Sequence, residues 1–398
     1  MGYKRRIGHW TADILAAGLR LGKQKTYRFF LDALWERYQV SYGDGPPLEA
    51  HLWCPDPIRP DAADRPLVER IFSAYRQAKQ TQGQVDRLYQ PSSMWKNILR
   101  TAYQDVTESL QANDIERFHS FLTNFGSWHQ PTGIEESRLI RQCAIDRHKA
   151  LHFEQKIMTP LIRWWLKFES DGRDLSALVM PNHGNFGGMS VNGHLISPGS
   201  VFTDVYARMI AGFLETDRPL IAELGGGFGR LVYFLSRHQS DFRYIGFDLP
   251  ETLCCASYFL MKTFPEKRFL LYGEREWDVT CLDDFDFLLL PSFEISKLPD
   301  QCVDLFINEN SLGELEAAAC EHYVREICRT TKAFWHRNHE CRRFLFERGT
   351  TSLLNREYPI PQDRFVRVVR YADLRPYVRS DYLECRSDMF WYYYRLRK

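Results

Sequence analysis

The chain of 398 residues is 44% apolar and 26% charged. This composition suffices for a sizeable packed core, and it excludes both a small disulfide-stabilised scaffold and a disordered protein. The 52 basic and 51 acidic residues leave a formal charge of +1. Because so small a charge gives no field to hold a phosphate polymer, we expect no nucleic-acid partner. No apolar run reaches the roughly 18 residues of a membrane span, so we expect no transmembrane segment.

The ten cysteines contain no C-x-x-C pair, and most lie in apolar stretches where a thiol packs like a small hydrophobic group. We therefore expect a reducing compartment and a cytoplasmic location. His336, His339 and Cys341 have no second ligand cluster at a usable spacing. We interpret them as solvated helix residues and expect no metal.

The N-terminus is mildly basic and amphipathic, but Asp13 interrupts any signal-peptide core, and Arg6 stands where myristoylation needs Ser or Thr. We expect an ordinary first helix, with peripheral contact to a membrane surface as the alternative. Oligomerisation also stays open.

The first 175 residues show helical periodicity and almost no strand alternation, which predicts an all-α N-terminal domain over residues 1–175. A proline-rich stretch at Gly43–Arg65 cannot hold regular structure and is expected to be a long surface loop, and a second break follows at Trp128–Gly133. This domain could bind a substrate or mediate oligomerisation. The helices are expected at Ala12–Val40, Pro66–Tyr89, Ser92–Gln111 and Glu136–Phe168.

Residues 176–199 are rich in glycine and are expected to form a connecting loop or a lid. From about residue 200, short apolar runs alternate with helix-like segments, as the β-α-β units of a parallel sheet require. Arg268–Tyr272 is an ambiguous run that competes for the third strand position. The prediction for residues 200–398 is a doubly wound, Rossmann-like α/β sheet of seven strands. These strands are expected at Leu220–Leu224, Tyr244–Asp248, Phe287–Pro291, Val303–Asn308, Phe344–Glu347, and, as an antiparallel pair, Phe365–Tyr371 and Met389–Leu396.

The segment from Leu220 to Leu235 contains the most informative motif. An apolar strand reaches Glu223, glycines follow at 225, 226, 227 and 229, and an amphipathic helix begins. Glycines remove the Cβ atoms that would block a ligand, and a helix N-terminus directs free N–H groups at it. We therefore expect a nucleotide-type cofactor to bind Glu223, Gly225, Gly226, Gly227 and Gly229.

The dinucleotide fingerprint G-x-G-x-x-G fails in both registers, because Arg230 or Val232 stands where the third glycine belongs. The observed pattern, acid-x-G-x-G-x-G, resembles the first motif of class I S-adenosylmethionine-dependent methyltransferases. That resemblance implies S-adenosylmethionine as the cofactor, with the loop beside its amino-acid portion.

Asp248 ends the next predicted strand, nineteen residues after Gly229. A carboxylate there can accept hydrogen bonds from both hydroxyls of a ribose. Capping of the following helix is a compatible role. Leu249, Ser292, Phe293 and Asn308, each at or just beyond the end of a predicted strand, complete the expected cofactor contacts.

Three segments resemble the bacterial sugar O-methyltransferase family: Asp248–Leu253, Asp304–Glu314 and the Gly-Asn loop Asn185–Gly193. The resemblance covers roughly residues 180–330. It implies transfer of a methyl group to a sugar hydroxyl on an activated, nucleotide-linked or lipid-linked glycan, as in polysaccharide biosynthesis.

The residues after the predicted strand 303–308 are expected to face the methyl group, since ligands of open α/β sheets bind beyond the carboxyl ends of the strands. Glu314 or Glu309 could accept the hydroxyl proton, while Asn310 and Ser311 could orient the acceptor. A capping box formed by Ser311 and Glu314 is the alternative interpretation. His183, and likewise His194, are rival candidates for the base, because imidazole titrates near neutral pH.

Two other functions stay open at this point. A methyltransferase of another small-molecule oxygen or nitrogen would keep every cofactor residue. A non-catalytic scaffold with a degenerate fold would bind no cofactor, and the intact glycine motif and Asp248 argue against it.

Overall fold

The computed structural model describes residues 48–127, 158–197, 199–373 and 388–397, and within the chain residues 48–398 form one compact unit. Three sequence predictions lie wholly or partly outside the described residues. They are the helix at Ala12–Val40, the break at Trp128–Gly133, and residues 136–157 of the helix expected at Glu136–Phe168. No helix in the described ranges is long and apolar enough to cross a membrane.

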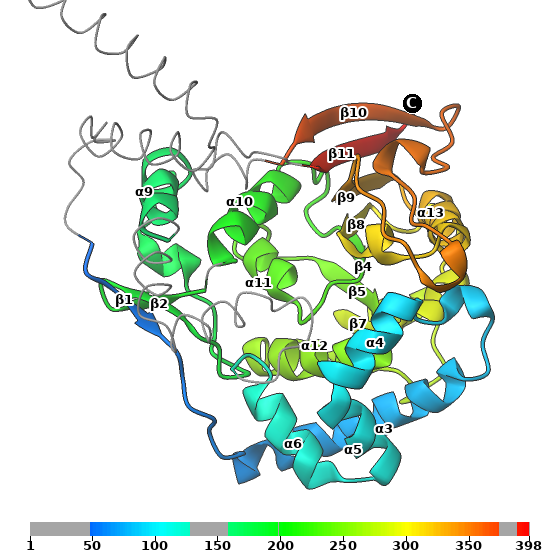
Figure 1. Cartoon of the computed structure of the whole chain (residues 1–398). Helices are drawn as coiled ribbons and strands as arrows, with labels where there is room; N and C mark the ends of the chain where they lie inside the picture. The colour runs from blue at the N-terminus through cyan, green and yellow to red at the C-terminus, as the bar shows by residue number, and fades with distance from the viewer. Residues whose placement is uncertain (1–47, 128–157, 198, 374–387, 398) are drawn as a thin grey trace, which may run out of the picture. The chain divides into compact units, whose positions relative to one another are not determined.

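An eight-stranded mixed sheet forms the centre of this unit, in the order β10-β11-β9-β8-β4-β5-β7-β6 (Figure 1). Its parallel strands run from β6 to β9, and the antiparallel hairpin β10–β11 completes one edge. The strands are β4 (Leu220–Leu224), β5 (Arg243–Asp248), β6 (Phe269–Leu271), β7 (Phe287–Pro291), β8 (Leu305–Glu309), β9 (Ala333–His339), β10 (Phe365–Ala372) and β11 (Met389–Leu396).

Two apolar layers cover the two faces of the sheet, as expected when parallel strands are buried on both sides. Successive residues of β4 alternate between the layers: Ile221 joins the layer of α10 (Ser200–Ala211), α11 (Arg230–Ser236) and α12 (Pro250–Thr263). Leu220 and Ala222 face the layer that contains α13 (Ala317–Thr330). The doubly wound α/β fold expected for the second half is therefore confirmed.

The expected count of seven strands is wrong. Arg268–Tyr272 does not compete with Phe287–Pro291, because both runs form strands: β7 pairs with β5, and β6 adds an eighth strand outside β7.

The predicted strand at Phe344–Glu347 is also wrong. Leu345 makes only an isolated bridge to Thr351, and the strand that pairs with β8 on the side away from β4 is β9. Its polar residues His336, Arg337 and Asn338 conceal it in the sequence, yet all three are buried. His336 is therefore no solvated helix residue; its ring stacks on Tyr392.

The described helices of the first half are α3 (Arg65–Gln82), α4 (Ser93–Thr101), α5 (Gln104–Ala112), α6 (Ile115–Asn124) and α9 (Thr159–Phe168). The expected helix Ser92–Gln111 is two helices, broken at Ala102 and Tyr103. In Figure 1 the blue and cyan helices α3 and α6 lie against α12 of the sheet layer. Tyr75 of α3 donates a hydrogen bond to the carbonyl of Leu289 in β7 (3.2 Å).

A second, three-stranded sheet joins the first half of the chain to the expected connecting segment 176–199. Its strands are β1 (Ala50–Trp53), β2 (Gly188–Val191) and β3 (His194–Ile196), and both pairings are antiparallel. The first half is consequently not all-α, and the stretch expected to be a loop contains a strand. Because β1 pairs with residues far along the chain, local periodicity gave no sign of it.

Candidate functional site

The glycine loop begins where β4 ends and leads into α11. Gly225, Gly227 and Gly229 have φ values of +76°, +61° and +94°, a left-handed region in which a side chain is strained. A Cβ atom at Gly225 would collide with Ser311, and one at Gly229 would lie 2.8 Å from Leu260 of α12. At Gly227 a Cβ atom would meet no described atom within 4 Å beyond its chain neighbours. Two of the glycines therefore permit close packing, while Gly227 faces open space.

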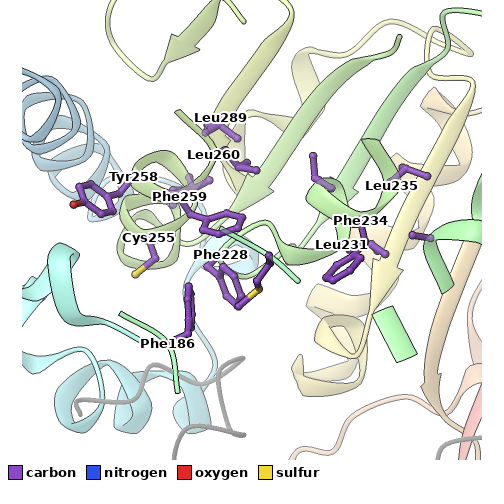
Figure 2. Packing of buried hydrophobic residues seen from close by; sticks show 14 of the residues in the cluster. Phe186, Phe228, Leu231, Phe234, Leu235, Cys255, Tyr258, Phe259, Leu260 and Leu289 are labelled. Atoms are coloured by element: carbon purple, nitrogen blue, oxygen red, sulfur yellow. The ribbon is translucent and has the colours of Figure 1, made fainter. Parts of the chain in front are cut away.

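Three aromatic residues, Phe186, Phe228 and Phe259, pack together at the glycine loop. Phe228 lies between Phe186 and Phe259, with ring centroids 4.8 and 5.1 Å away (Figure 2). Phe186 belongs to the expected Gly-Asn loop, whose Asn185 donates to the carbonyl of Asp56 (2.9 Å) and to Asn124 (3.0 Å). The segment expected to be a lid thus packs behind the glycine loop.

Asp248, at the end of β5, crosses to the loop. Its two carboxylate oxygens accept from the backbone N–H groups of Gly227 (3.1 Å) and Leu249 (2.7 Å). A carboxylate has about four acceptor positions, so these two bonds leave capacity for a ligand. Burial raises the pKa of Asp248 to about 7, against the lowering effect of the two N–H donors.

Glu223 is buried near the end of β4 and accepts a hydrogen bond from the hydroxyl of Tyr244 (2.8 Å). Burial raises the pKa of Glu223 to about 8, and the nearby carboxylates of Glu309 and Asp248 add to the rise. The Tyr244 bond acts in the opposite direction. A positively charged ligand would stabilise the ionised form of Glu223 and so lower its pKa.

Asn308, at the end of β8, holds the glycine loop to the segment that follows β8. Its amide donates to the carbonyl of Leu224 (2.9 Å) and to Ser311 (2.5 Å), and its own oxygen accepts from Asn338 of β9 (2.8 Å). Ser311 donates to the same Leu224 carbonyl (3.0 Å). Asn308 is fully buried, so its role is to position the loop.

The buried Arg337 of β9 holds the next two residues of this segment. It donates to Glu309 and to the side-chain oxygen of Asn310, both at 3.0 Å, and it pairs with Asp373 at 2.5 Å. Asn310 has a φ of +67°, a conformation that costs free energy and that the bonds of Arg337 help to maintain. Glu309 is a less suitable base than expected, because a carboxylate oxygen of Glu309 is already held by the guanidinium of Arg337.

Trp95 of α4 reaches Glu314 from the helical half of the unit. Its indole Nε1 donates to a carboxylate oxygen of Glu314 at 2.9 Å, across 219 residues of sequence. Tyr89 hydrogen-bonds His322 of α13 (2.9 Å), and Ser93 accepts from the backbone of Glu347 (3.1 Å). These contacts fix residues 89–95 against the carboxyl ends of the strands.

The loop, the strand ends and the segment 89–95 enclose a cavity of about 230 Å³. Four carboxylates line it, and Arg230 is the single cationic side chain among its described lining residues. The described residues include no cluster of three or more His, Cys, Asp or Glu side chains able to hold a metal. The lining residues are Tyr89, Gln90, Pro91, Ser92, Trp95, Thr203, Glu223, Leu224, Gly225, Gly226, Gly227, Phe228, Arg230, Leu231, Asp248, Leu249, Thr252, Ser292, Glu309, Asn310, Ser311, Glu314, Leu315 and Tyr323.

Most of the expected site residues lie in this cavity wall. Gly229, Asn308 and Phe293 do not: the first two position the loop, and Phe293 packs edge-on against Tyr272 (5.6 Å). The expected residues that line the cavity are Glu223, Gly225, Gly226, Gly227, Asp248, Leu249, Ser292, Glu309, Asn310, Ser311 and Glu314.

The two candidate histidines fall outside the cavity. His183 lies against Phe259 (6.4 Å between centroids), where burial lowers its pKa, and His194 is on β3. None of the described residues within 176–199 is among those that line the cavity. The physical reason is that this segment pairs with β1 and packs behind the glycine loop.

Sequence reasoning missed the contributions of the helical half and of α10. Arg230 and Thr252 could have been found, since they lie inside the motif segments Leu220–Leu235 and Asp248–Leu253. Tyr89, Trp95 and Thr203 give no local signal, because only the packing of distant helices brings them to the strand ends.

No protein-family model and no curated protein matches this chain. Comparison with solved structures finds several methyltransferases. Mitomycin 7-O-methyltransferase overlaps 50% of this chain at 11% identity and a TM-score of 0.32, and this chain covers 56% of its length.

Two further neighbours were solved with ligands. 1,6-Didemethyltoxoflavin-N1-methyltransferase of Burkholderia thailandensis, with bound 1,6-didemethyltoxoflavin and S-adenosylhomocysteine, overlaps 49% of this chain and 79% of its own at 15% identity and a TM-score of 0.32. A glycopeptide N-methyltransferase with sinefungin overlaps 49% of this chain and 87% of its own at 12% identity and a TM-score of 0.31. At such low similarity, functional conclusions for this chain must rest on its own residues.

Proposed function

We propose that this protein is an S-adenosylmethionine-dependent methyltransferase that transfers a methyl group to a hydroxyl oxygen, with a sugar hydroxyl as the acceptor. The observation that carries the proposal is the pair Gly227 and Asp248. Gly227 leaves open space beside the loop, and Asp248 presents to the same cavity a carboxylate that has room for further hydrogen bonds.

The cavity residues fit this cofactor chemically. Asp248 has acceptor capacity for ribose hydroxyls, and Glu223 offers a carboxylate to the ammonium group of the amino-acid portion. The guanidinium of Arg230 is suited to its carboxylate. When bound, the cofactor supplies an electrophilic methyl group on a positively charged sulfur.

The charge of the wall favours this cofactor over a dinucleotide. When ionised, the lining carboxylates attract a sulfonium and an ammonium group, and they repel a pyrophosphate. With the dinucleotide fingerprint also broken at Arg230, both sequence and electrostatics support the same choice.

For the acceptor, Glu314 is our proposed base. Glu314 would take the proton of the acceptor hydroxyl as that oxygen receives the methyl group, and S-adenosylhomocysteine would be the leaving group. Asn310 and Ser311 line the same part of the wall and can orient the hydroxyl. Transfer to an oxygen or nitrogen of another small molecule is the second candidate, because it would use the same cofactor residues of the cavity wall.

The test has two stages. Titration calorimetry with S-adenosylhomocysteine should detect binding at a single site. Mass spectrometry of a glycan pool incubated with protein and S-adenosylmethionine should then show products heavier by one CH2 group. Absence of S-adenosylhomocysteine binding would refute the methyltransferase proposal, whereas binding together with methylation of only non-sugar compounds would refute the sugar acceptor alone.

A further inference from the structure

The segment 89–95 forms a wall of the cavity that lies outside the glycine loop and the strand ends. Trp95 is the aromatic residue of that wall closest to the proposed base, because its indole N–H binds Glu314 directly. On another side the indole packs against Tyr103, with centroids 6.5 Å apart and planes tilted by 47°. Ring position and tilt are therefore fixed before any acceptor arrives.

We infer that Trp95 and Glu314 form an acceptor subsite for an uncharged, hydroxyl-bearing ring, the apolar face of which stacks on the indole while a hydroxyl faces Glu314. This inference rests on the proposed function and specifies its substrate class. It also identifies Trp95 as the residue that selects the acceptor.

The geometry supports a ring in this place. A fixed indole offers a flat apolar surface at low entropic cost, and Glu314 beside it is an acceptor-only group when ionised. A pyranose ring has the complementary character, with C–H groups on its face and hydroxyls at its edge. The anchors of Tyr89 on His322 and of Ser93 on Glu347 hold the wall in place, so binding does not have to build it.

The charges support a neutral ring. Glu309 and Glu314 both line this part of the cavity, and the guanidinium nearest to Glu309, that of Arg337, is already held by Glu309, Asn310 and Asp373. A phosphate attached close to the reacting hydroxyl would meet two carboxylates. An activated glycan can therefore be the substrate only if its phosphate lies outside the cavity.

The specificity test compares methyl glycosides of common hexoses with the corresponding hexose 1-phosphates, using the mass gain of one CH2 group to follow methylation. We expect kcat/KM for the methyl glycosides to be higher by about tenfold or more. A preference for the phosphates would overturn the inference and leave the proposed function standing. If neither set is methylated although S-adenosylhomocysteine binds, the sugar acceptor and this inference both fail.

The subsite test uses Trp95→Leu, which removes the stacking surface, and Trp95→Phe, which keeps a ring but removes the N–H donor. Trp53→Phe on β1 is the matched control, since Trp53 is half-exposed and lies outside the cavity. For Trp95→Leu we expect KM for the glycoside to rise roughly tenfold while S-adenosylhomocysteine affinity stays within about twofold. Trp95→Phe should recover most of this loss, and the control should match the unaltered protein.

Two results would contradict a specificity role for Trp95. One is an unchanged glycoside KM in Trp95→Leu. The other is an equal loss of S-adenosylhomocysteine affinity and glycoside KM in that variant, which would mean that Trp95 only supports the shape of the whole cavity. Circular dichroism of each variant separates these outcomes from misfolding.

Discussion

The two walls of the cavity are built in different ways. On one wall, Gly227 and Asp248 are 21 residues apart and meet through two neighbouring parallel strands. On the other, Trp95 and Glu314 are 219 residues apart and meet only because α4 packs across the strand ends. The first wall is a local β-α-β unit, which any sequence with the right strand ends and glycines can form. The second depends on the tertiary arrangement of this particular chain.

The difference indicates which wall suits a ligand that is always the same and which wall suits a ligand that differs from one enzyme to another. A local unit suits a ligand that never changes, because its geometry follows from one strand, one loop and one helix. A wall contributed by a distant helix can change shape without disturbing the sheet. We therefore assign the cofactor to the first wall and the choice of acceptor to the second.

The strongest way to break the local wall is Gly227→Val. The added side chain enters the open space of the cavity, so S-adenosylhomocysteine binding should become undetectable by calorimetry. Gly193→Val is the matched control: Gly193 also has a positive φ (+81°) and open space, but it lies in the β2–β3 turn outside the cavity. Both variants should lose a similar roughly 1–2 kcal/mol of stability from backbone strain. Normal binding by Gly227→Val would remove the loop from the site.

Glu314→Gln tests the chemistry of the second wall. If Glu314 takes the proton, turnover should fall by about 10² to 10⁴ while S-adenosylhomocysteine affinity stays level. The observed geometry already weakens the capping alternative, since residues 311–314 form a short 3-10 turn whose preceding residue is Asn310. Glu321→Gln on the exposed face of α13 provides the control. Near-normal turnover would move the base assignment to Glu309.

Asp248→Ala should have a smaller effect, confined to the cofactor. Loss of a charged hydrogen bond of about 1.5–3 kcal/mol should weaken S-adenosylhomocysteine binding by about 10- to 150-fold. Asp278→Ala removes a comparable carboxylate that accepts from the backbone of Thr280, outside the cavity, and should leave affinity unchanged. Equal affinity in both variants would remove Asp248 from the cofactor site.

A pH dependence is also expected for the local wall. The pKa of Asp248 is raised to about 7 and that of Glu223 to about 8, so both are largely protonated at pH 6. A cationic cofactor favours the ionised forms, so its binding releases protons, and affinity should rise from pH 6 to about 8.5 by up to about tenfold per pH unit for each proton released. Calorimetry in buffers of different ionisation enthalpy counts these protons; a flat profile would contradict the charge pairing.

The free energy of unfolding of the ligand-free protein should change with pH in the opposite direction, falling as pH rises. Because the folded pKa values lie above the ordinary values of 3.8 and 4.5, the contribution of these two groups is full at low pH and is lost as pH rises through 7 and 8. The melting temperature of the free protein should therefore fall over the range in which cofactor affinity rises. Glu223→Gln should flatten part of both curves.

The sequence by itself determined the elements that depend on local pattern. Strands β4, β5 and β7 and the turn into α11 lie where apolar runs and glycines predict them, and Asp248 ends β5 as expected. These predictions succeed because strand burial, glycine conformation and strand-end position are set by residues close in sequence. The first wall of the cavity could be predicted for the same reason.

Only the tertiary structure decided the features that depend on distant partners. Strand β9 is hidden in the sequence because Arg337 and Asn338 are polar, and they can be buried only because Asp373 and Asn308 satisfy them. Strand β1 needs β2 as its partner, and Trp95 needs the packing of the helical half to reach Glu314. Such pairings depend on where the whole chain folds back on itself, which no local periodicity records.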